Sequence, residues 1–446
     1  MNNIGWSSDN EMKESLEKIS ISSKEGKSGL PIVYDKDDAY ILNSNSNTLV
    51  VGVTGSGKTQ STILPQLKIA IDKGDNVVVN DVKGEIYALL GNTLDKEGYK
   101  TVVLNFDNPE YGNAWNPLGF AYHTYKSGMI DKSLHMIEDL GYYLLNDPKD
   151  AMSDPFWTNT TIDYFTGIVL YLFDNAKEEE INLNSVARVA NDLSRNNNYE
   201  EFMNQFDKNS TIYINLSGTL LAPPETRASI VSVFNQKIKK YISFQKLSSM
   251  LSYNDFDIDK LFVDKTAVFI ISGLSSTSNS LLPLFVNQAI DMLDSLKLKN
   301  RKTNIILDEF DSLLPINNFA KLINYARSIN VVFTTVIRSY IDLKNTYGEA
   351  NSELIKSCFS NCIYLLASDI YTLDEVSRDC GMVNNKLLIT PEELKLMGKF
   401  EAIITVPRSK PMRAVLTPYY KLTDYNKIVQ KELSKRKEKE IKIYNV

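Results

Sequence analysis

Gly52-Val53-Thr54-Gly55-Ser56-Gly57-Lys58-Thr59 is the stretch that decides the fold of this 446-residue chain. It fills each fixed position of the phosphate-binding loop pattern G-x-x-x-x-G-K-[ST]. The apolar run 48–51 before it is typical of a buried strand, and residues 60–70 after it are typical of the start of a helix. Backbone N–H groups in such a turn point at phosphate oxygens, at the positive end of the following helix. The stretch therefore predicts a strand–loop–helix unit for phosphate binding rather than a simple glycine-rich turn.

Each residue type in this loop has a chemical role. Lys58 is predicted to reach the β- and γ-phosphates of a nucleotide, and the Thr59 hydroxyl is predicted to bind Mg²⁺. The residues expected to contact the nucleotide are Gly52, Thr54, Gly55, Ser56, Gly57, Lys58, Thr59 and Gln60.

A nucleotide site also needs an acidic element, and the apolar run 304–307 ends in Asp308 and Glu309. A parallel strand that is buried on both faces has this composition, and its carboxyl end opens onto the crevice where α/β folds bind ligands. Asp308 is predicted to hold Mg²⁺, and Glu309 is predicted to act as the general base on the attacking water. An acidic pair with glutamate second favours hydrolysis over phosphoryl transfer to another substrate.

Composition sets broad limits on the class of protein. A chain of this length predicts two or three domains with ample core. Three cysteines and two histidines without metal-ligand spacing disfavour a disulfide framework and a zinc site, and indicate a reducing compartment. The net charge of −6 excludes a broadly basic surface. Any contact with nucleic acid would therefore use local loops or an assembled channel.

The order of strand-like and helix-like segments predicts an α/β domain with an insertion. Strands are predicted at 48–51, 76–81, 101–106, 266–271, 304–307, 331–336, 362–366 and 402–406, and helices at 85–97, 131–145, 157–175, 183–192 and 226–244. Strands that alternate with helices favour a parallel sheet. Between Pro117 and the strand predicted at 266–271, the apolar residues recur with the period of a helix, and strand-like runs are missing. The aromatic residues there, Tyr142, Tyr143, Trp157, Tyr164, Phe165, Tyr171 and Phe173, are expected to pack in a core rather than stack on bases.

The domain boundaries follow from this pattern. We expect a polar N-terminal segment at 1–27, the first part of a nucleotide-binding domain at 28–119, an all-α inserted domain at 120–248, the second part of the nucleotide-binding domain at 249–425, and a charged C-terminal tail at 426–446. The tail has mixed charge and is expected to form a solvated helix or to fray. Neither a signal peptide nor a run long enough to cross a membrane is expected.

Several separate motifs occur in the order typical of one protein family. They are Gly52–Thr59 with Pro65 after it, Asp81-Val82-Lys83-Gly84-Glu85, Asn105-Phe106-Asp107 through Trp115-Asn116-Pro117-Leu118, Asp154-Pro155-Phe156-Trp157, Leu307-Asp308-Glu309-Phe310, and Arg327-Ser328 followed by 343–348. With these motifs, residues 28–420 resemble the conjugative type IV secretion coupling proteins, the TraG/VirD-type ATPases of the FtsK/HerA class of DNA translocases. Val82 and Asn108 stand where proline is usual in that family.

The resemblance implies a RecA-like P-loop ATPase core with a mainly parallel sheet and an inserted all-α domain that docks substrates. It implies ATP and Mg²⁺ as cofactors. It also implies homo-hexameric rings whose channel passes DNA, single- or double-stranded, independently of sequence. The implied partners are a relaxase–DNA complex or effector proteins, together with components of the type IV secretion channel.

Arg338 is one departure from the family pattern, because that strand-end position usually holds a glutamine thought to sense the γ-phosphate. Arg338 is therefore a candidate catalytic residue that keeps a donor there, or else a side chain that turns outward. Rings of this class complete each site with an arginine from a neighbouring subunit. The candidates for that arginine are Arg227, Arg327, Arg338 and Arg378.

The N-terminus is a second departure. Many relatives begin with transmembrane helices ahead of the segment that matches Gly5-Trp6 onward. The chain is thus either a naturally soluble member or a cytosolic fragment, and it would reach a membrane only through missing helices or a partner. The expected location is the cytoplasm, at the inner face of the bacterial cell membrane.

Two functions remain open on the sequence. One is a motor in which ATP hydrolysis drives transfer, and the other is a nucleotide-gated recruitment platform with little turnover. Glu309 favours the motor, because a protein that only binds nucleotide needs no general base. Arg338, which stands where the family usually has glutamine, is the reason to retain the recruitment platform as an alternative.

Overall fold

The computed structural model describes residues 5–146, 154–195, 199–273, 278–297 and 301–445. The chain divides into two compact units. Unit 1 comprises residues 1–101, 262–270 and 296–432, and unit 2 comprises residues 102–261, 271–295 and 433–446. The helices predicted within 120–248 fall in unit 2, which also takes in flanking residues on both sides and the end of the tail.

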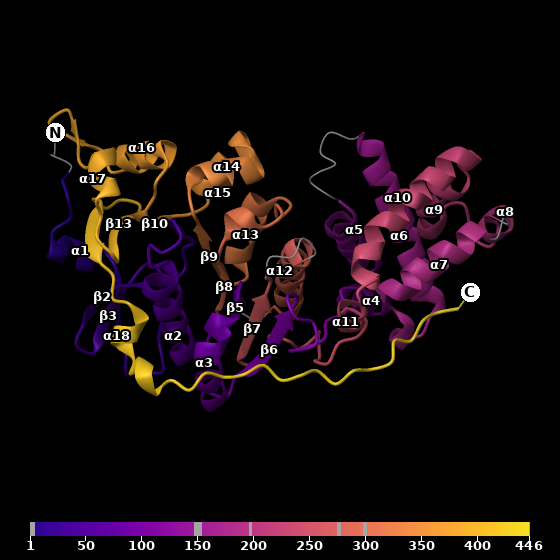
Figure 1. Cartoon of the computed structure of the whole chain (residues 1–446), viewed down its shortest axis with the longest axis horizontal. Coiled ribbons are helices and arrows are strands. Elements are labelled where there is room, and N and C mark those ends of the chain that lie inside the picture. Colours follow the sequence, from indigo (N-terminus) through magenta and orange to yellow (C-terminus); the bar gives the residue numbers. More distant parts are fainter. Residues whose placement is uncertain (1–4, 147–153, 196–198, 274–277, 298–300, 446) are drawn as a thin grey trace. The chain divides into compact units, whose positions relative to one another are not determined.

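The central sheet has, among the described residues, nine strands in the order β14-β13-β10-β4-β9-β8-β5-β7-β6 (Figure 1). In chain order these strands are β4 (Thr48–Gly52), β5 (Asn76–Asn80), β6 (Lys100–Asn105), β7 (Thr266–Ile271), β8 (Thr303–Leu307), β9 (Val331–Ile337), β10 (Asn361–Leu366), β13 (Glu401–Thr405) and β14 (Met412–Val415). The pairings from β10 through β4, β9, β8 and β5 to β7 are parallel, whereas β13 and β14 are added antiparallel. The predicted α/β class with a mainly parallel sheet is confirmed.

The strands at the centre of this sheet are buried at every position. This holds for β4, β5, β7, β8 and β9, which carry mostly valine, isoleucine, leucine and phenylalanine. Such runs form parallel strands that are covered on both faces, because β-branched and aromatic side chains pack well on a pleated surface. The carboxyl ends of β4 and β8 carry the two predicted functional motifs, and β9 pairs with both strands, so the sheet brings the motifs to one edge.

The remaining elements of unit 1 connect these strands or flank them. They are α1 (Asp9–Ser15), β1 (Glu17–Ser20), β2 (Pro31–Asp35), β3 (Asp38–Ile41), η1 (Thr59–Ile63), α2 (Leu64–Lys73), α3 (Glu85–Lys96), η4 (Phe310–Ser312), α13 (Phe319–Ser328), α14 (Tyr340–Tyr347), α15 (Glu349–Ser357), α16 (Ile370–Asp379), β11 (Met382–Val383), β12 (Lys386–Leu387), α17 (Pro391–Lys395), α18 (Tyr419–Leu422) and η5 (Tyr425–Lys427). Strands β1, β3 and β2 form an antiparallel sheet, which was not predicted from the sequence. They are short and partly exposed, so they lack the long apolar runs that identified the buried strands.

Unit 2 is built mainly of helices. They are α4 (Gly119–Lys126), α5 (Ile130–Leu145), α6 (Pro155–Asn175), η3 (Glu178–Glu180), α7 (Leu183–Arg195), α8 (Tyr199–Met203), α9 (Thr211–Leu220), α10 (Pro224–Ile242), α11 (Gln245–Met250) and most of α12 (Ser278–Leu296). Helix α6 begins at the N-cap Asp154, whose side chain accepts from the Phe156 N–H, with Pro155 at the first helical position. Residues 164–173 of this helix are all buried, as expected of a helix that is surrounded by others.

The aromatic residues of unit 2 mostly belong to its core, as predicted. Tyr143, Tyr164, Phe165, Tyr171 and Phe173 are all buried. Tyr164 packs edge-on against Phe234 of α10, with ring centroids 5.3 Å apart. Buried rings are not available as a stacking surface for nucleic-acid bases.

The C-terminal tail contradicts the expectation of a solvated helix or a frayed end. Residues 428–445 form no helix and run extended (Figure 1, yellow). On unit 1, the Lys431 N–H donates to the Ala88 carbonyl of α3 (2.9 Å), and Asn92 of the same helix donates to the Val429 carbonyl (2.8 Å). Backbone pairing of this kind satisfies donors and acceptors that water would otherwise take.

On unit 2, the anchor of the tail is Arg436, which is only 8% exposed. Its guanidinium donates to the Tyr253 hydroxyl (2.8 Å) and to the Pro109 carbonyl (2.9 Å). Further along, the Tyr444 ring packs on Tyr171. The charge pattern correctly predicted that the tail is polar. It did not predict that a buried arginine anchors the tail, because a buried charge needs partners that only the folded chain supplies.

No helix among the described residues is both long enough and apolar enough to cross a membrane.

Candidate functional site

The predicted phosphate-binding loop lies between β4 and η1. Gly55 and Gly57 have φ angles of +85° and +96°, which residues with a side chain rarely adopt. A Cβ on Gly57 would lie 2.6 Å from the Phe400 ring, and one on Gly52 would lie 2.6 Å from Ser56 Oγ. The loop therefore makes the tight turn that its glycines were expected to allow. At Gly57 the Phe400 ring covers it closely.

The helix predicted for residues 60–70 begins differently from expectation. Residues Thr59–Ile63 form a π-helical turn, with the Leu64 N–H donating to the Thr59 carbonyl, and the α-helix starts only at Leu64. Pro65 explains part of this, because it has no N–H to donate and is best accommodated in the first turn of an α-helix. The sequence pattern located the helix but not this change of register.

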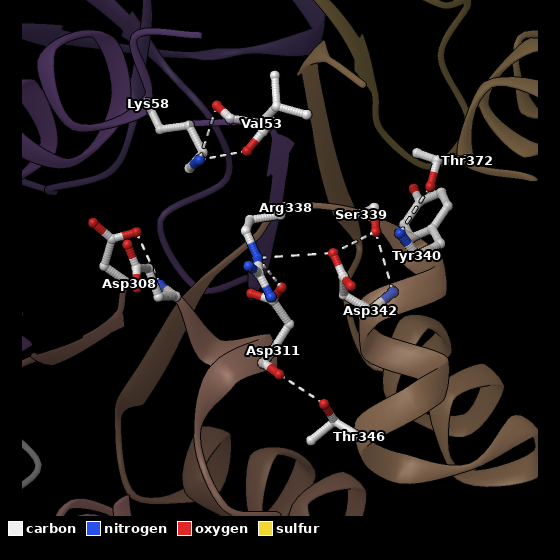
Figure 2. A network of polar contacts seen from close by, with 12 residues as sticks. Val53, Lys58, Asp308, Asp311, Arg338, Ser339, Tyr340, Asp342, Thr346 and Thr372 are labelled. Atoms are coloured by element: carbon white, nitrogen blue, oxygen red, sulfur yellow. Dashed lines mark hydrogen bonds and ion pairs between the residues drawn. The ribbon is translucent and has the colours of Figure 1, made fainter. Parts of the chain in front are cut away.

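Lys58 lies beside the loop carbonyls and close to the acidic motif (Figure 2). Its Nζ donates to the Gly52 carbonyl and to the Val53 carbonyl, the latter at 3.2 Å. Burial lowers the pKa of Lys58, while the nearby charge of Asp308 opposes that shift. A partly desolvated ammonium of this kind interacts strongly with phosphate oxygens.

Asp308 and Glu309 follow the end of β8, as predicted. Asn80 at the end of β5 donates to the Asp308 main-chain carbonyl (2.6 Å), and the Glu309 N–H donates to Asp308 Oδ1 (2.9 Å). Glu309 has a φ of +50°, a left-handed conformation that is strained for a residue with a side chain. Strain of this kind is concentrated at functional sites, where the surrounding structure enforces it.

One cavity joins the loop and the acidic pair. It has a volume of about 320 Å³ and is lined by Thr54, Gly55, Gly57, Lys58, Thr59, Gln60, Asp81, Val82, Lys83, Glu85, Ile86, Asp308, Glu309, Lys399, Phe400 and Tyr420. The lining thus contains the ammonium, hydroxyl and carboxylates predicted to act on a nucleotide and its metal. Gly52 and Ser56, which were also predicted to contact the nucleotide, are not part of the cavity lining.

The residues at this cavity have the chemistry that a nucleotide with Mg²⁺ requires. Ser56 Oγ and Gln60 Oε1 are buried without a hydrogen-bond partner in the protein, so both can still form hydrogen bonds to a ligand. Thr59 and Asp308 supply the hard oxygen ligands that Mg²⁺ prefers. Lys58 supplies the charge for the phosphates. The donor set therefore fits both groups.

Arg338 lies at the end of β9 and is held by two aspartates (Figure 2). Its Nε donates to Asp311 Oδ2 (2.8 Å) and lies 3.7 Å from Asp342 Oδ2. Asp311 is fully buried at its side chain, and burial raises its pKa while Arg338 opposes that shift. Arg338 is not part of the cavity lining, so its predicted catalytic role remains a prediction.

The other arginines considered for a role between subunits differ in their surroundings. Arg227 lies over the Tyr199 ring at 3.9 Å and donates to the carbonyls of Leu220 and Ala222, which is a structural arrangement within unit 2. Arg327 and Arg378 are exposed. A role of Arg327 or Arg378 between subunits stays a prediction.

Asp81 contributes a buried carboxylate to the cavity. It is 2% exposed, and it accepts a hydrogen bond from the Tyr87 N–H in the first turn of α3 (2.8 Å). Burial raises the pKa of Asp81 to about 6, although that hydrogen bond partly opposes the shift. The folded protein thus binds a proton at Asp81 more tightly than the unfolded chain does. Between pH 3.8 and about 6 the unfolded chain has lost this proton while the folded protein keeps it, so stability falls as the pH rises through this window, and the cost is fully present above pH 6.

Asp81→Asn is expected to stabilise the nucleotide-free protein at pH 7.5 by about 1–3 kcal/mol, because it removes a buried charge and keeps an acceptor for the Tyr87 N–H. The gain should disappear near pH 4, where the parent carboxyl is neutral. Urea unfolding at the two pH values measures the difference. Asp35→Asn is the control, since Lys13 lowers the pKa of Asp35 and its replacement should bring no gain. Equal stability of parent and Asp81→Asn at both pH values would contradict the expectation.

Eight residues of the cavity were not predicted as site residues: Asp81, Val82, Lys83, Glu85 and Ile86, which lie at the motif 81–85 or directly after it, and Lys399, Phe400 and Tyr420, which belong to no quoted motif. Lys399 and Phe400 precede β13, and Tyr420 lies in α18, more than 340 residues after the loop. Nothing in Gly398-Lys399-Phe400 or in the run 418–422 distinguishes these side chains from ordinary loop residues. Only the position of β13 beside β10 and of β10 beside β4 brings them to the loop.

A family model supports the motif order seen in the sequence. The family is described as type IV secretory system conjugative DNA transfer, and its model matches residues 6–386. Among curated proteins, none matches this chain significantly.

Solved structures of low sequence identity share the fold. The bacterial conjugative coupling protein TrwBdeltaN70, in a trigonal form with sulphate, matches with a TM-score of 0.70 at 13% identity, covering 98% of this chain and 96% of that chain. TrwB with the non-hydrolysable ATP analogue ADPNP matches with a TM-score of 0.67 at 14% identity and the same coverage. VirB4 of Thermoanaerobacter pseudethanolicus matches with a TM-score of 0.54 at 11% identity, covering 90% of this chain and 100% of that chain.

Proposed function

Because the chain belongs to the type IV secretory system conjugative DNA transfer family, we propose that it is an ATP-hydrolysing coupling protein. In this role it recruits a relaxase–DNA complex, or effector proteins, to a type IV secretion channel and drives their transfer. The observation that carries the proposal is that Lys58, Thr59, Asp308 and Glu309 line one and the same cavity. TrwB, which shares the fold, has been solved with ADPNP and with ADP and Mg²⁺.

Each residue of the cavity has a separate role in the proposed hydrolysis. Lys58 binds the β- and γ-phosphate oxygens, and the loop N–H groups orient them. Thr59 and Asp308 would hold Mg²⁺, which when bound would neutralise charge on the phosphates. Glu309 orients the attacking water and accepts its proton, and its position next to Asp308 keeps it at the same end of β8.

Assembly extends this proposal from one subunit to a homo-hexameric ring. A net charge of −6 gives an isolated subunit little overall attraction for the DNA backbone. In a ring, copies of a modest basic loop would converge on one channel. DNA binding should therefore be weak for the monomer, independent of sequence, and steeply reduced by salt, because backbone contacts release counterions.

The rate of ATP hydrolysis per subunit is expected to rise with protein concentration and with added DNA. Both changes favour assembly, which completes sites between neighbouring subunits. A steady-state ATPase titration against protein concentration, with and without single-stranded DNA, measures this. Repetition with duplex DNA, and at two salt concentrations, separates backbone attraction from other effects.

A rate of ATP hydrolysis per subunit that changes neither with protein concentration nor with added DNA would contradict the proposal of a motor. It would favour a nucleotide-gated recruitment platform with little turnover. The contacts of Arg338 with Asp311 and Asp342 favour that alternative, because they engage a guanidinium that could otherwise assist hydrolysis. Pull-down of the cognate relaxase with and without nucleotide then tests the platform directly.

A further inference from the structure

Two aromatic side chains lie at the nucleotide cavity beside the phosphate-binding loop. Phe400 covers Gly57 so closely that no Cβ would fit between them, and it is 9% exposed. The Tyr420 ring lies 6.2 Å from the Phe400 ring, measured between centroids, with an angle of 60° between the planes. Tyr420 is 43% exposed although its neighbour Tyr419 is buried. The pair thus offers a fixed ring at the loop and a more open ring next to it.

The backbone holds Phe400 at the loop. Its φ of +67° is strained for a residue with a side chain, and its carbonyl accepts from the Leu416 N–H (2.8 Å), directly after β14. The β13–β14 hairpin that follows Phe400 belongs to the central sheet. This conformation, which a strand of the sheet follows directly, places the ring against Gly57 and in the lining of the cavity.

The chemistry of this part of the cavity differs from that of the loop. Phosphates need N–H groups and cations, which the turn up to Thr59 and Lys58 provide. Besides the loop, the acidic pair and five residues within 81–86, the lining contains the two rings and Lys399, whose Nζ lies 5.2 Å from the Phe400 ring centroid. Aromatic faces with one nearby cation suit a flat heteroaromatic group, because stacking provides binding energy without requiring matched donors and acceptors. Gln60 lines the same cavity, and its buried Oε1 could accept from a donor on a nucleoside.

We propose that Phe400 and Tyr420 hold the base of the bound nucleoside triphosphate, and so form the part of the site that distinguishes a nucleotide from bare polyphosphate. This inference rests on the proposed function of the cavity as a nucleotide site. Phe400 packs at the loop and fixes the inner edge of the base, while Tyr420 contributes a face that is open to it. Because the contacts are made through ring faces, the pair selects for an aromatic base and only weakly between adenine and guanine.

The test compares two ligands that share phosphates and differ in the base, namely ATP and inorganic tripolyphosphate, each with Mg²⁺ and measured by calorimetry. Tyr420→Ala is expected to weaken ATP binding about 5- to 100-fold and to leave tripolyphosphate binding unchanged. Phe400→Leu keeps apolar bulk over Gly57 but loses the aromatic face, and it should show the same selective loss. Tyr420→Phe keeps the ring and should restore ATP affinity to within about threefold of the parent.

Tyr425→Ala is the matched control, because Tyr425 is 38% exposed, lies five residues further on, and is not part of the cavity lining. Its affinities for both ligands should equal those of the parent. Equal losses for ATP and tripolyphosphate in Tyr420→Ala and Phe400→Leu would overturn the inference, since the rings would then act by shaping the loop. Unchanged ATP binding in both variants would overturn it as well. If the parent binds neither ligand, the proposed nucleotide site itself is wrong; if it binds both equally, only the inference about the base fails.

Discussion

Lys58→Ala is expected to abolish ATP hydrolysis, with a loss of at least about 10³-fold, and to weaken nucleotide binding. The side chain provides the charge that meets the β- and γ-phosphates, where negative charge is spread over several oxygens during phosphoryl transfer. Its surroundings strengthen the effect. Lys58 is half-buried, and this burial lowers its pKa, so water screens the ammonium less than it would at the surface.

Steady-state ATPase measurements and nucleotide calorimetry on the same preparation check this expectation. Lys96→Ala, an exposed lysine in the last turn of α3, is the control and should behave like the parent. Thermal unfolding of Lys58→Ala shows whether loss of the bonds to the Gly52 and Val53 carbonyls has disturbed the fold. A correctly folded variant with unchanged turnover would mean that the loop has no part in hydrolysis.

Glu309→Gln is expected to preserve ATP binding and to reduce turnover by about 10²-fold or more. Glutamine has nearly the same shape, but it cannot accept the proton of the attacking water. The main chain at this position should be retained, because the Glu309 N–H remains bonded to Asp308 and the Ser312 N–H to the Glu309 carbonyl.

Single-turnover hydrolysis and ATP affinity, measured together, separate the possible roles of Glu309. Glu349→Gln, at the exposed start of α15, should leave both quantities unchanged. A Glu309→Gln protein that loses ATP affinity and keeps its rate would assign the side chain to metal binding or structure. A slow variant that still binds ATP would also be a useful trap for any assembled form of the protein.

Much of the core could be predicted because its sequence signals are local. The strands that became β4, β5, β7 and β8 are unbroken apolar runs, and burial on both faces demands such runs. The loop and the acidic pair follow two of these strands directly. Their meeting at one cavity then follows from parallel pairing, in which carboxyl ends share one edge of the sheet.

The features that were missed depend on contacts between distant segments. Phe400 and Tyr420 reach the cavity only through the order of strands β4, β10 and β13. The pairing of Arg338 with Asp311 depends on the turn that follows Glu309, which periodicity does not describe. Short helices such as α8 and α9 lacked a long apolar pattern and were not predicted.

The extended tail has a practical consequence for anyone who handles the protein. Trypsin cleaves after lysine and arginine, and residues 427–442 contain seven such sites, at Lys427, Lys431, Lys435, Arg436, Lys437, Lys439 and Lys442. A protease must bind the backbone of a segment before it can cut it, so a segment that is already extended must still leave the surface to which it is bound. Because Arg436 is buried and the backbone on either side is hydrogen-bonded, brief digestion should spare these sites while the tail is bound. Early loss of a short C-terminal fragment would therefore reveal, by mass alone, a preparation in which the tail has come away.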